Sequence, residues 1–187
     1  NGLDVSVAEL TKITGADVEF VSAGNIDVNG LTAASTATIS GTLILDSAAD
    51  VNFVTAASTT TNGLTVEADN QVDIDVAITT NAGNLSIDGD ADNAADTNDK
   101  VDIATGLTLT TAGLMTLDAT TGGLVGAGTL DLDAKTGITL NDNLTTAGTT
   151  DINADSDGTG GVGTLTLAAG KTLSTTNNIL TITAEDL

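Results

Sequence analysis

The chain has 187 residues, 40% of them hydrophobic, which is a typical size for a single domain with a sizeable core. It carries 26 acidic residues against four basic ones, and this net charge of −22 excludes nucleic acid as a partner and disfavours binding to an anionic membrane surface, because both bind basic surfaces. His, Cys, Pro, Trp and Tyr are absent, so there is no disulfide framework and the core must be built from Leu, Ile, Val and Ala. The longest apolar runs are only a few residues, so the sequence predicts no transmembrane segment.

The N-terminal segment allows two interpretations. Residues 5–13 carry a weak helical pattern, which suggests a cap formed by residues 1–15. Leu3, Val5 and Val7 also alternate with polar residues, as in an edge strand. The chain begins without a Met or a signal-like segment, which suggests a processed product or a piece of a longer protein.

From residue 16 onward the sequence repeats itself. Residues 16–23 (ADVEFVSA) return as residues 49–56 (ADVNFVTA), 33 residues later. Residues 110–113 (TTAG) return at 145–148, a spacing of 35 residues. A period of this length is the signature of solenoids, in which each repeat buries its apolar face against a neighbour. We therefore predict one repetitive β domain over the whole chain, residues 1–187, with repeats of about 33–35 residues.

Within the repeats, apolar residues alternate with Thr, Asp or Asn, the pattern of short half-buried strands. Clear examples are residues 42–46, 72–76, 129–133 and 180–183. The sequence therefore predicts an all-β fold, a parallel β-helix in which one repeat forms either one large coil or about one and a half smaller coils. In the one-coil version, Phe20 and Phe53 occupy the same corner of neighbouring layers. The alternative fold is an antiparallel β-sandwich of repeated hairpins.

A family resemblance supports the solenoid. The Thr-, Asn- and Gly-rich string at residues 137–148 (GITLNDNLTTAG) resembles the repeats of large secreted bacterial β-helix exoproteins, of the filamentous-haemagglutinin and autotransporter-adhesin type. The resemblance covers most of the chain and is one of composition, without an invariant signature. It implies a right-handed parallel β-helix, export from the cell, and a role at the cell surface or in a matrix. The chain differs from that family in its very low basic and aromatic content and in the length of its period.

One acidic loop has the spacing of a calcium-binding loop. Asp88, Asp90, Asp92, Asp96 and Asp99 occupy positions one, three, five, nine and twelve of a twelve-residue stretch. Ca²⁺ prefers six to eight oxygen ligands, and small residues between the carboxylates allow one turn to surround the ion. We therefore predict a Ca²⁺ site here. The alternative is a solvated acidic loop.

A second acidic loop carries a similar, shorter pattern. Its candidate ligands are Asn153, Asp155 and Asp157, followed by a glycine at the position where such loops turn sharply. The loop has no acidic residue at its end. Divalent cations are thus the predicted ligands of both loops.

An enzymatic role is not expected. Asp73 with Asp75, and Asp131 with Asp133, each share one face of a strand, as the paired carboxylates of a glycosidase do. With no His, Arg or Tyr in the chain, orientation of a substrate and stabilisation of charge would fall on Lys and the backbone alone. We therefore predict that the protein is not an enzyme.

Pairs of the form Thr-x-Thr raise the question of a flat threonine array, such as one that orders ice-like water. The 35-residue repeat places Thr166 beside Asp131, which breaks the array. The simpler interpretation is that the threonines form the outward faces of strands.

The ends of the chain suggest assembly. Ile179, Leu180 and Ile182 belong to a strand close to the C-terminus, and the alternating segment described above begins the chain, so neither end has a recognisable cap. An uncovered terminal coil presents unpaired backbone groups and an apolar cross-section. We therefore predict a non-enzymatic extracellular structural protein, a subunit or segment of a surface fibre that self-associates end to end. The alternative is a calcium-dependent cell-surface adhesin module that binds a glycan or a protein.

Overall fold

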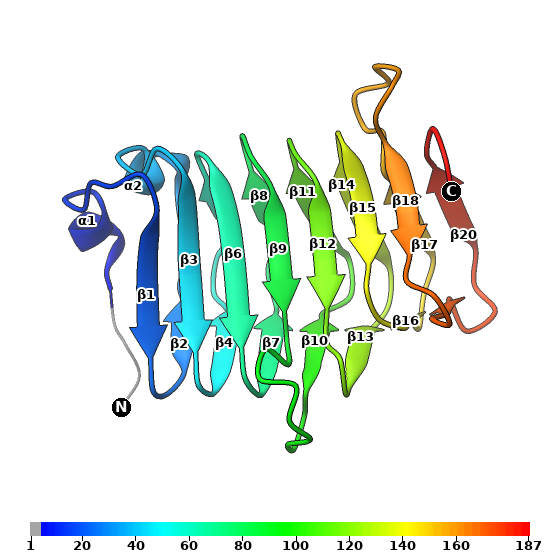
Figure 1. Ribbon diagram of the computed structural model, residues 1–187, viewed down its shortest axis with the longest axis horizontal. Coiled ribbons are helices and arrows are strands. Elements are labelled where there is room, and N and C mark those ends of the chain that lie inside the picture. The colour runs from blue at the N-terminus through cyan, green and yellow to red at the C-terminus, as the bar shows by residue number, and fades with distance from the viewer. Residues whose placement is uncertain (1–4) are drawn as a thin grey trace.

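The computed structural model describes residues 5–187 as an all-β solenoid of about seven turns, with 4% helix. The strands of neighbouring coils pair in parallel and form three sheets along the molecule. In Figure 1 the front strands run downward and the chain returns upward behind them while it advances from left to right, so the solenoid is right-handed. The predicted parallel β-helix is confirmed, and the antiparallel sandwich is wrong.

Each turn contributes one strand to each sheet, apart from the first turn, which has no strand in sheet three. Sheet one, at the front of Figure 1, consists of β1 (Val18–Ser22), β3 (Thr42–Ser47), β6 (Gly63–Ala68), β9 (Leu85–Asp88), β12 (Met115–Asp118), β15 (Gly137–Leu140) and β18 (Thr164–Leu167). Sheet two consists of β2 (Ile26–Val28), β4 (Asp50–Phe53), β7 (Gln71–Ile74), β10 (Lys100–Ile103), β13 (Gly123–Gly126), β16 (Leu144–Thr146) and β19 (Leu173–Ser174). Sheet three consists of β5 (Ser58–Thr60), β8 (Ile78–Thr80), β11 (Leu107–Thr111), β14 (Leu130–Ala134), β17 (Thr150–Asn153) and β20 (Leu180–Thr183).

The coil is shorter than the sequence repeat. Leu43 lies beside Leu64, and Leu64 lies beside Leu85, a spacing of 21 residues per coil in this part of the chain. Phe20 lies in sheet one and Phe53 in sheet two, so the 33-residue repeat advances the chain by one coil and one further sheet. The one-coil version of the prediction is therefore wrong, and the version with smaller coils is the correct one.

The core consists of aliphatic ladders that run the length of the molecule. Inward-facing residues of successive strands stack directly on one another, because parallel coils in register place the same strand position about 4.8 Å further along the axis. One such ladder on sheet one is Leu43, Leu64, Leu85, Met115, Ile138 and Leu165. All its members are at most 6% exposed. Thin layers of this kind fill the interior without large aromatic side chains, as the composition requires.

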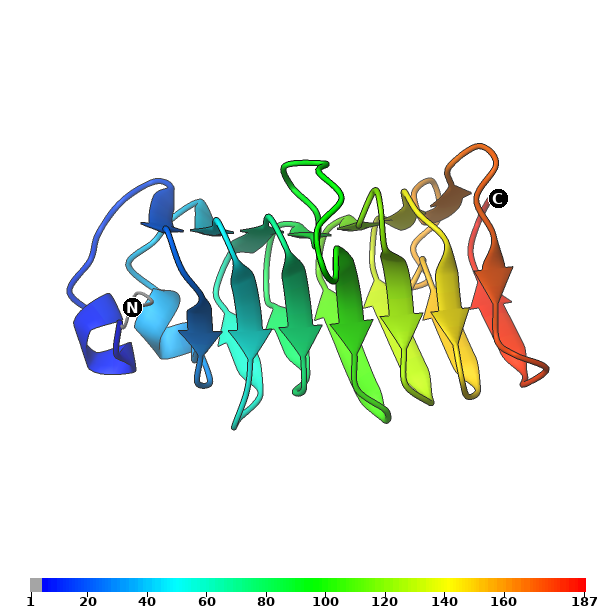
Figure 2. The ribbon, with the colours of Figure 1, turned by 90° about the horizontal axis from the view of Figure 1, so that it is seen from below.

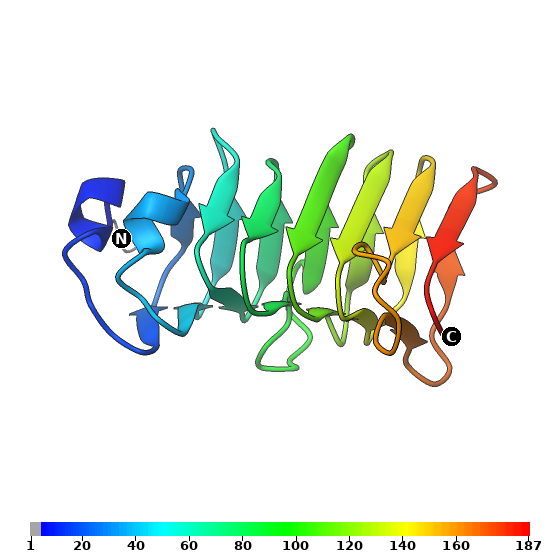
Figure 3. The same cartoon turned by 90° about the horizontal axis from the view of Figure 1, so that it is seen from above.

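Two short helices lie at the N-terminal end (Figures 1–3). Helix α1 (Val7–Leu10) begins at Ser6, whose hydroxyl accepts a hydrogen bond from Glu9 N at 3.2 Å, while the Glu9 carboxylate accepts one from Ser6 N at 3.0 Å. This reciprocal capping box favours a helix over an extended strand. Helix α2 (Ala33–Thr36) contacts β5 and stands where the first turn would otherwise place a strand of sheet three.

The helices agree with one interpretation of the N-terminal segment and contradict the other. The weak helical pattern is confirmed at α1, whereas the strand interpretation is wrong because Val7 begins the helix and Val5 lies outside any strand. Leu3 lies outside the described residues. At the N-terminal end, α1 packs on α2 and α2 on β5, whereas β1 and β2 each keep one edge without a neighbouring strand within residues 5–187. The expectation that this end is uncapped therefore stays a prediction.

The true register also restores the threonine ladder. Thr166 lies beside Thr139, and Thr139 lies beside Thr116, on the outer face of sheet one. The ladder continues through Ser86 to Thr65. The expectation that Thr166 lies beside Asp131 is wrong, because the 35-residue repeat does not correspond to a whole number of coils.

The ladder packing predicts the effect of removing a core side chain. Leu117 is fully buried and stacks between Ile87 and Leu140, so Leu117→Ala leaves a cavity that neighbouring coils cannot close without breaking their register. We expect this change to lower the free energy of unfolding by about 2–5 kcal/mol in equilibrium urea denaturation. The adjacent outward-facing Thr116→Ala serves as the control and should change it by less than about 0.5 kcal/mol. Equal losses in the two variants would contradict the assigned inner and outer faces.

Candidate functional site

Two corners of the solenoid carry long insertions. Residues 89–99 connect β9 to β10, whereas only residues 69–70 connect the preceding pair, β6 and β7. Residues 154–163 connect β17 to β18, whereas only residues 135–136 connect β14 and β15. Figures 1 and 2 show the first insertion projecting from the body of the molecule, and Figure 1 shows the second at the opposite edge. These insertions contain most of the predicted cation ligands.

The first insertion holds two buried carboxylates. Asp90 is 0% exposed, and its Oδ2 accepts a hydrogen bond from Thr121 N at 2.7 Å. Asp99 is 3% exposed, and its Oδ2 accepts one from Asp96 N at 2.6 Å. Asp88, the last residue of β9, accepts a hydrogen bond from Asp90 N at 3.0 Å. The loop is thus folded around its own acidic residues.

The remaining predicted ligands of this loop point elsewhere. Asp92 and Asp96 are exposed, and the Asp92 carboxylate accepts a hydrogen bond from Ala94 N at 2.8 Å. Within residues 5–187, no group of three or more acidic side chains converges in an arrangement that could hold a metal ion. The five carboxylates predicted as one ligand set are therefore not gathered at one point, and Ca²⁺ binding stays a prediction.

The second insertion is less enclosed. Asn153 ends β17 beside Asp133 and is partly buried, as is Asp155. Asp157 is exposed, and its Oδ1 accepts hydrogen bonds from the hydroxyl of Thr159 at 2.7 Å and from Thr159 N at 3.1 Å. These bonds lower the pKa of Asp157. The three candidate ligands therefore follow the loop without forming a ring.

An acidic ladder on the outer face of sheet one was not predicted from the sequence. Asp46, Glu67, Asp88 and Asp118 lie side by side on four successive coils. Like charges directly opposite one another on neighbouring strands are destabilising. The ladder ends at Asn141, whose amide donates a hydrogen bond to Asp118 Oδ2 at 3.1 Å. Each ladder member follows an aliphatic–x–aliphatic triplet, a signal that is visible in the sequence once the coil length is known.

The ladder changes the acidity of its members. Burial, together with the charges of Asp46 and Asp88, raises the pKa of Glu67 above its ordinary value of 4.5. Burial also raises the pKa of Asp88, and the charges of Asp118 and Asp90 add to this, against the hydrogen bond from Asp90 N. Stacking in register therefore forces carboxylates into positions where their ionised forms are disfavoured.

The C-terminal coil is open. Ile182 is 39% exposed although its partner in the preceding coil, Ile152, is fully buried. Leu167 is 38% exposed although Leu140 is fully buried. Two other residues predicted for assembly, Ile179 and Leu180, are also exposed. Residues that would form the next rungs of the core ladders thus face solvent at this end.

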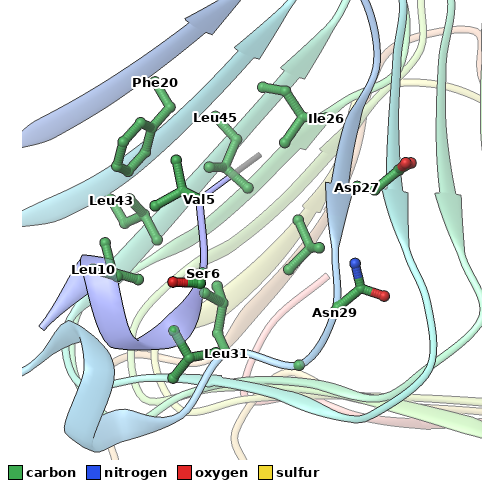
Figure 4. Close-up of a pocket in the computed structure, with 13 residues that line it drawn as sticks. Val5, Ser6, Leu10, Phe20, Ile26, Asp27, Asn29, Leu31, Leu43 and Leu45 are labelled. Carbon is green, nitrogen blue, oxygen red and sulfur yellow. The ribbon is translucent and has the colours of Figure 1, made fainter. Parts of the chain in front are cut away.

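The N-terminal end contains a cavity of about 310 Å³ instead of an open coil. Figure 4 shows Val5 and Leu10 beside Phe20, Leu43 and Leu45, from β1 and β3, with Asp27 and Asn29 across from them. Val5 therefore packs toward the core, whereas Val7, on α1, is 38% exposed.

Comparison with protein-family models, curated protein sequences and solved structures found no match. Within residues 5–187, no helix has the length and apolar character required to cross a membrane. The parallel β-solenoid implied by the family resemblance is the observed fold.

The raised pKa values predict an unusual pH dependence. Because Glu67 and Asp88 bind protons more tightly in the folded chain, the folded state gains protons relative to the unfolded state as the pH falls from neutral toward 4.5. We therefore expect the melting temperature at constant ionic strength, in the presence of a chelator, to rise as the pH falls through this window. Glu67→Gln should raise the melting temperature at pH 7 and flatten the rise.

Asp157→Asn is the matched control, because it removes the same charge at an exposed site whose pKa is lowered. This variant should keep the pH dependence of the parent chain. A melting temperature of the parent chain that falls steadily as the pH falls over this range would contradict the destabilising effect of the ionised ladder. So would a Glu67→Gln variant whose melting temperature depends on pH as steeply as that of the parent.

Proposed function

We propose that the protein is a non-enzymatic structural element of an extracellular surface fibre, and that it joins a second copy of itself through its open C-terminal coil. The observation that carries this proposal is the exposure of core-ladder positions on β18 and β20, since the matching positions one coil earlier are fully buried. A further coil at this position would bury them in the way every internal coil does.

Backbone groups support the same surface. Strands β18, β19 and β20 each end their sheet within residues 5–187. The start of β18 is bridged by Asp186, whose carbonyl oxygen accepts a hydrogen bond from Leu165 N at 3.0 Å, so the free edges are those of β19, β20 and the end of β18. Edges of this kind are templates for pairing with another chain. Addition of a strand to a sheet edge gives affinity through main-chain hydrogen bonds, and the exposed aliphatic side chains add burial.

The opposite end of a second copy offers a complementary surface. Strands β1 and β2 begin the two sheets that β18 and β19 end. At the third sheet, β20 would meet α1 and α2, where Val7 is exposed and can pack against Leu180 and Ile182. Contact between the two different ends is heterologous, and it propagates into a filament if it does not close into a ring.

Charge sets the conditions for assembly. With a net charge of −22, copies of this chain repel one another at low ionic strength. Salt shortens the range of this repulsion to roughly 8 Å at 0.15 M. Assembly should therefore require physiological salt or divalent cations, as extracellular fluids provide.

The proposal predicts the effect of charging the open coil. Leu180 and Ile182 point toward the core, whereas Thr181, between them, lies beside the exposed Asp151 on the outer face. Leu180→Lys combined with Ile182→Lys places two positive charges on the apolar end of the solenoid. This double substitution should abolish filaments, measured by electron microscopy and sedimentation velocity at about 0.15 M salt, where the repulsion between surface charges is screened. Thr181→Lys should leave assembly intact.

Circular dichroism of the doubly substituted chain should still show a folded β protein, because both side chains are already solvent-exposed in the isolated molecule. A parent chain that stays monomeric at high concentration in physiological salt would overturn the fibre proposal.

A further inference from the structure

Among residues 5–187, three aspartates are buried, and they differ in their partners. Asp90, Asp99 and Asp142 are each at most 3% exposed. A buried carboxylate is costly unless it is paired with a cation and its oxygens accept hydrogen bonds. The three aspartates differ in whether a cationic side chain and hydrogen-bond donors meet this need.

Asp142 is paired within the protein. Lys171 Nζ lies 2.9 Å from Asp142 Oδ1, which also accepts a hydrogen bond from Asn143 N. The only other lysine in an ion pair within residues 5–187 is Lys100, which lies 2.7 Å from Asp102 Oδ2. Neither lysine therefore serves the two buried aspartates of the insertion.

Asp90 and Asp99 each keep one oxygen without a partner. The Oδ2 atom of each accepts a backbone hydrogen bond, whereas the Oδ1 atom of each is buried and has no hydrogen-bond partner in the described part of the chain. The same condition holds for only two other side-chain atoms there, Asn153 Oδ1 and Asp155 Oδ1. All four are acceptor oxygens, and all four belong to the two loops in which the sequence predicts cation ligands.

Both buried carboxylates belong to one corner of the solenoid. Asp90 accepts its hydrogen bond from Thr121, in the turn that connects β12 to β13. The backbone of Asp99 packs on the next residue of that turn, Gly122, so closely that a Cβ on Gly122 would lie 2.1 Å from Asp99 O. The two ends of the insertion therefore pack against the neighbouring turn, where both side chains are buried, while residues 92–98 between them are exposed.

The surroundings of this corner are negative. Burial raises the pKa of Asp69, in the preceding corner, and the charges of Asp92, Asp46, Asp96 and Asp90 raise it further. No positively charged side chain within residues 5–187 forms an ion pair with any of these residues. The corner therefore has a surplus of negative charge and unsatisfied acceptor oxygens, which a hard cation neutralises.

We propose that the insertion 89–99 binds a divalent cation, with Ca²⁺ as the ligand of best fit, through Asp90 Oδ1 and Asp99 Oδ1. Ca²⁺ accepts a variable shell of six to eight oxygens that includes backbone carbonyls and water, so two carboxylates from one insertion can be its charged ligands, with carbonyls and water completing the shell. Mg²⁺ demands a near-ideal octahedron and holds its water tightly, which fits an irregular loop less well. The ion neutralises Asp90 and Asp99 in the way that the Lys171 ammonium neutralises Asp142.

The test compares the full chain in chelator, in CaCl₂, and in NaCl of matched ionic strength. Because only the folded state holds the site, calcium at a hundredfold excess over its dissociation constant should raise the melting temperature by on the order of 5 °C beyond the NaCl sample. Isothermal titration calorimetry should show a calcium event that is lost in Asp90→Asn and in Asp99→Asn. Asp92→Asn is the matched control, because it removes the same charge from an exposed position of the same loop.

A second readout separates cation binding from a purely structural role. In chelator, Asp90→Asn should melt no lower than the parent chain, because it removes an unpaired buried charge while its side-chain oxygen still accepts the hydrogen bond from Thr121 N. In calcium the order should reverse, with the parent chain more stable. Equal effects of CaCl₂ and NaCl on the parent chain, or a calcium effect in Asp90→Asn and Asp99→Asn as large as in Asp92→Asn, would overturn the proposal.

Discussion

In-register stacking of parallel coils is the constraint on which the rest of this structure depends. A single turn of about 21 residues has no core of its own, because its aliphatic side chains are covered only by the turns before and after it. Ile152 is fully buried under the last coil, whereas Ile182, one coil later, is 39% exposed. Stability is therefore a property of neighbouring pairs of coils, and an end without a cap is a surface that a further coil would stabilise.

The same register that builds the core also aligns the charges. A strand position that points outward repeats on every coil, so an acidic residue at that position meets another acidic residue about 4.8 Å away. Asp46, Glu67, Asp88 and Asp118 show this effect on sheet one. A chain with 26 acidic residues and four lysines cannot pair most of its carboxylates internally, so it depends on solvent and cations for compensation. Lys171 beside Asp142 is a case in which the chain supplies the cation itself.

Alternation of apolar residues with Thr and Asp predicted the strands and their inner and outer faces, because these follow from the two-residue period. The long sequence repeat, which is typical of stacked coils, predicted the solenoid. The 33-residue repeat gave a wrong prediction of which residues are neighbours on adjacent coils. Phe20 and Phe53 have similar flanking sequences, but they lie in different sheets. The tetrads Leu43–Asp46, Leu64–Glu67 and Leu85–Asp88 carry the true period of 21 residues. The acidic spacing located the insertion at residues 89–99 but not which carboxylates are buried, because burial depends on the turn that contains Thr121 in the next coil.

Disulfide trapping tests the stacking register most directly. The chain has no native cysteine, so an introduced pair can form only the intended disulfide within one molecule. Thr116 and Thr139 are partners on neighbouring strands of sheet one, at a separation within the range that a disulfide spans. Thr116→Cys with Thr139→Cys should therefore oxidise quantitatively to an intramolecular disulfide in the folded chain. Thr116→Cys with Asp151→Cys follows the 35-residue repeat instead and joins β12 of sheet one to β17 of sheet three, so it should remain reduced. The opposite result, a disulfide at the 35-residue spacing and none between Thr116 and Thr139, would contradict the account of the coil on which every other inference rests.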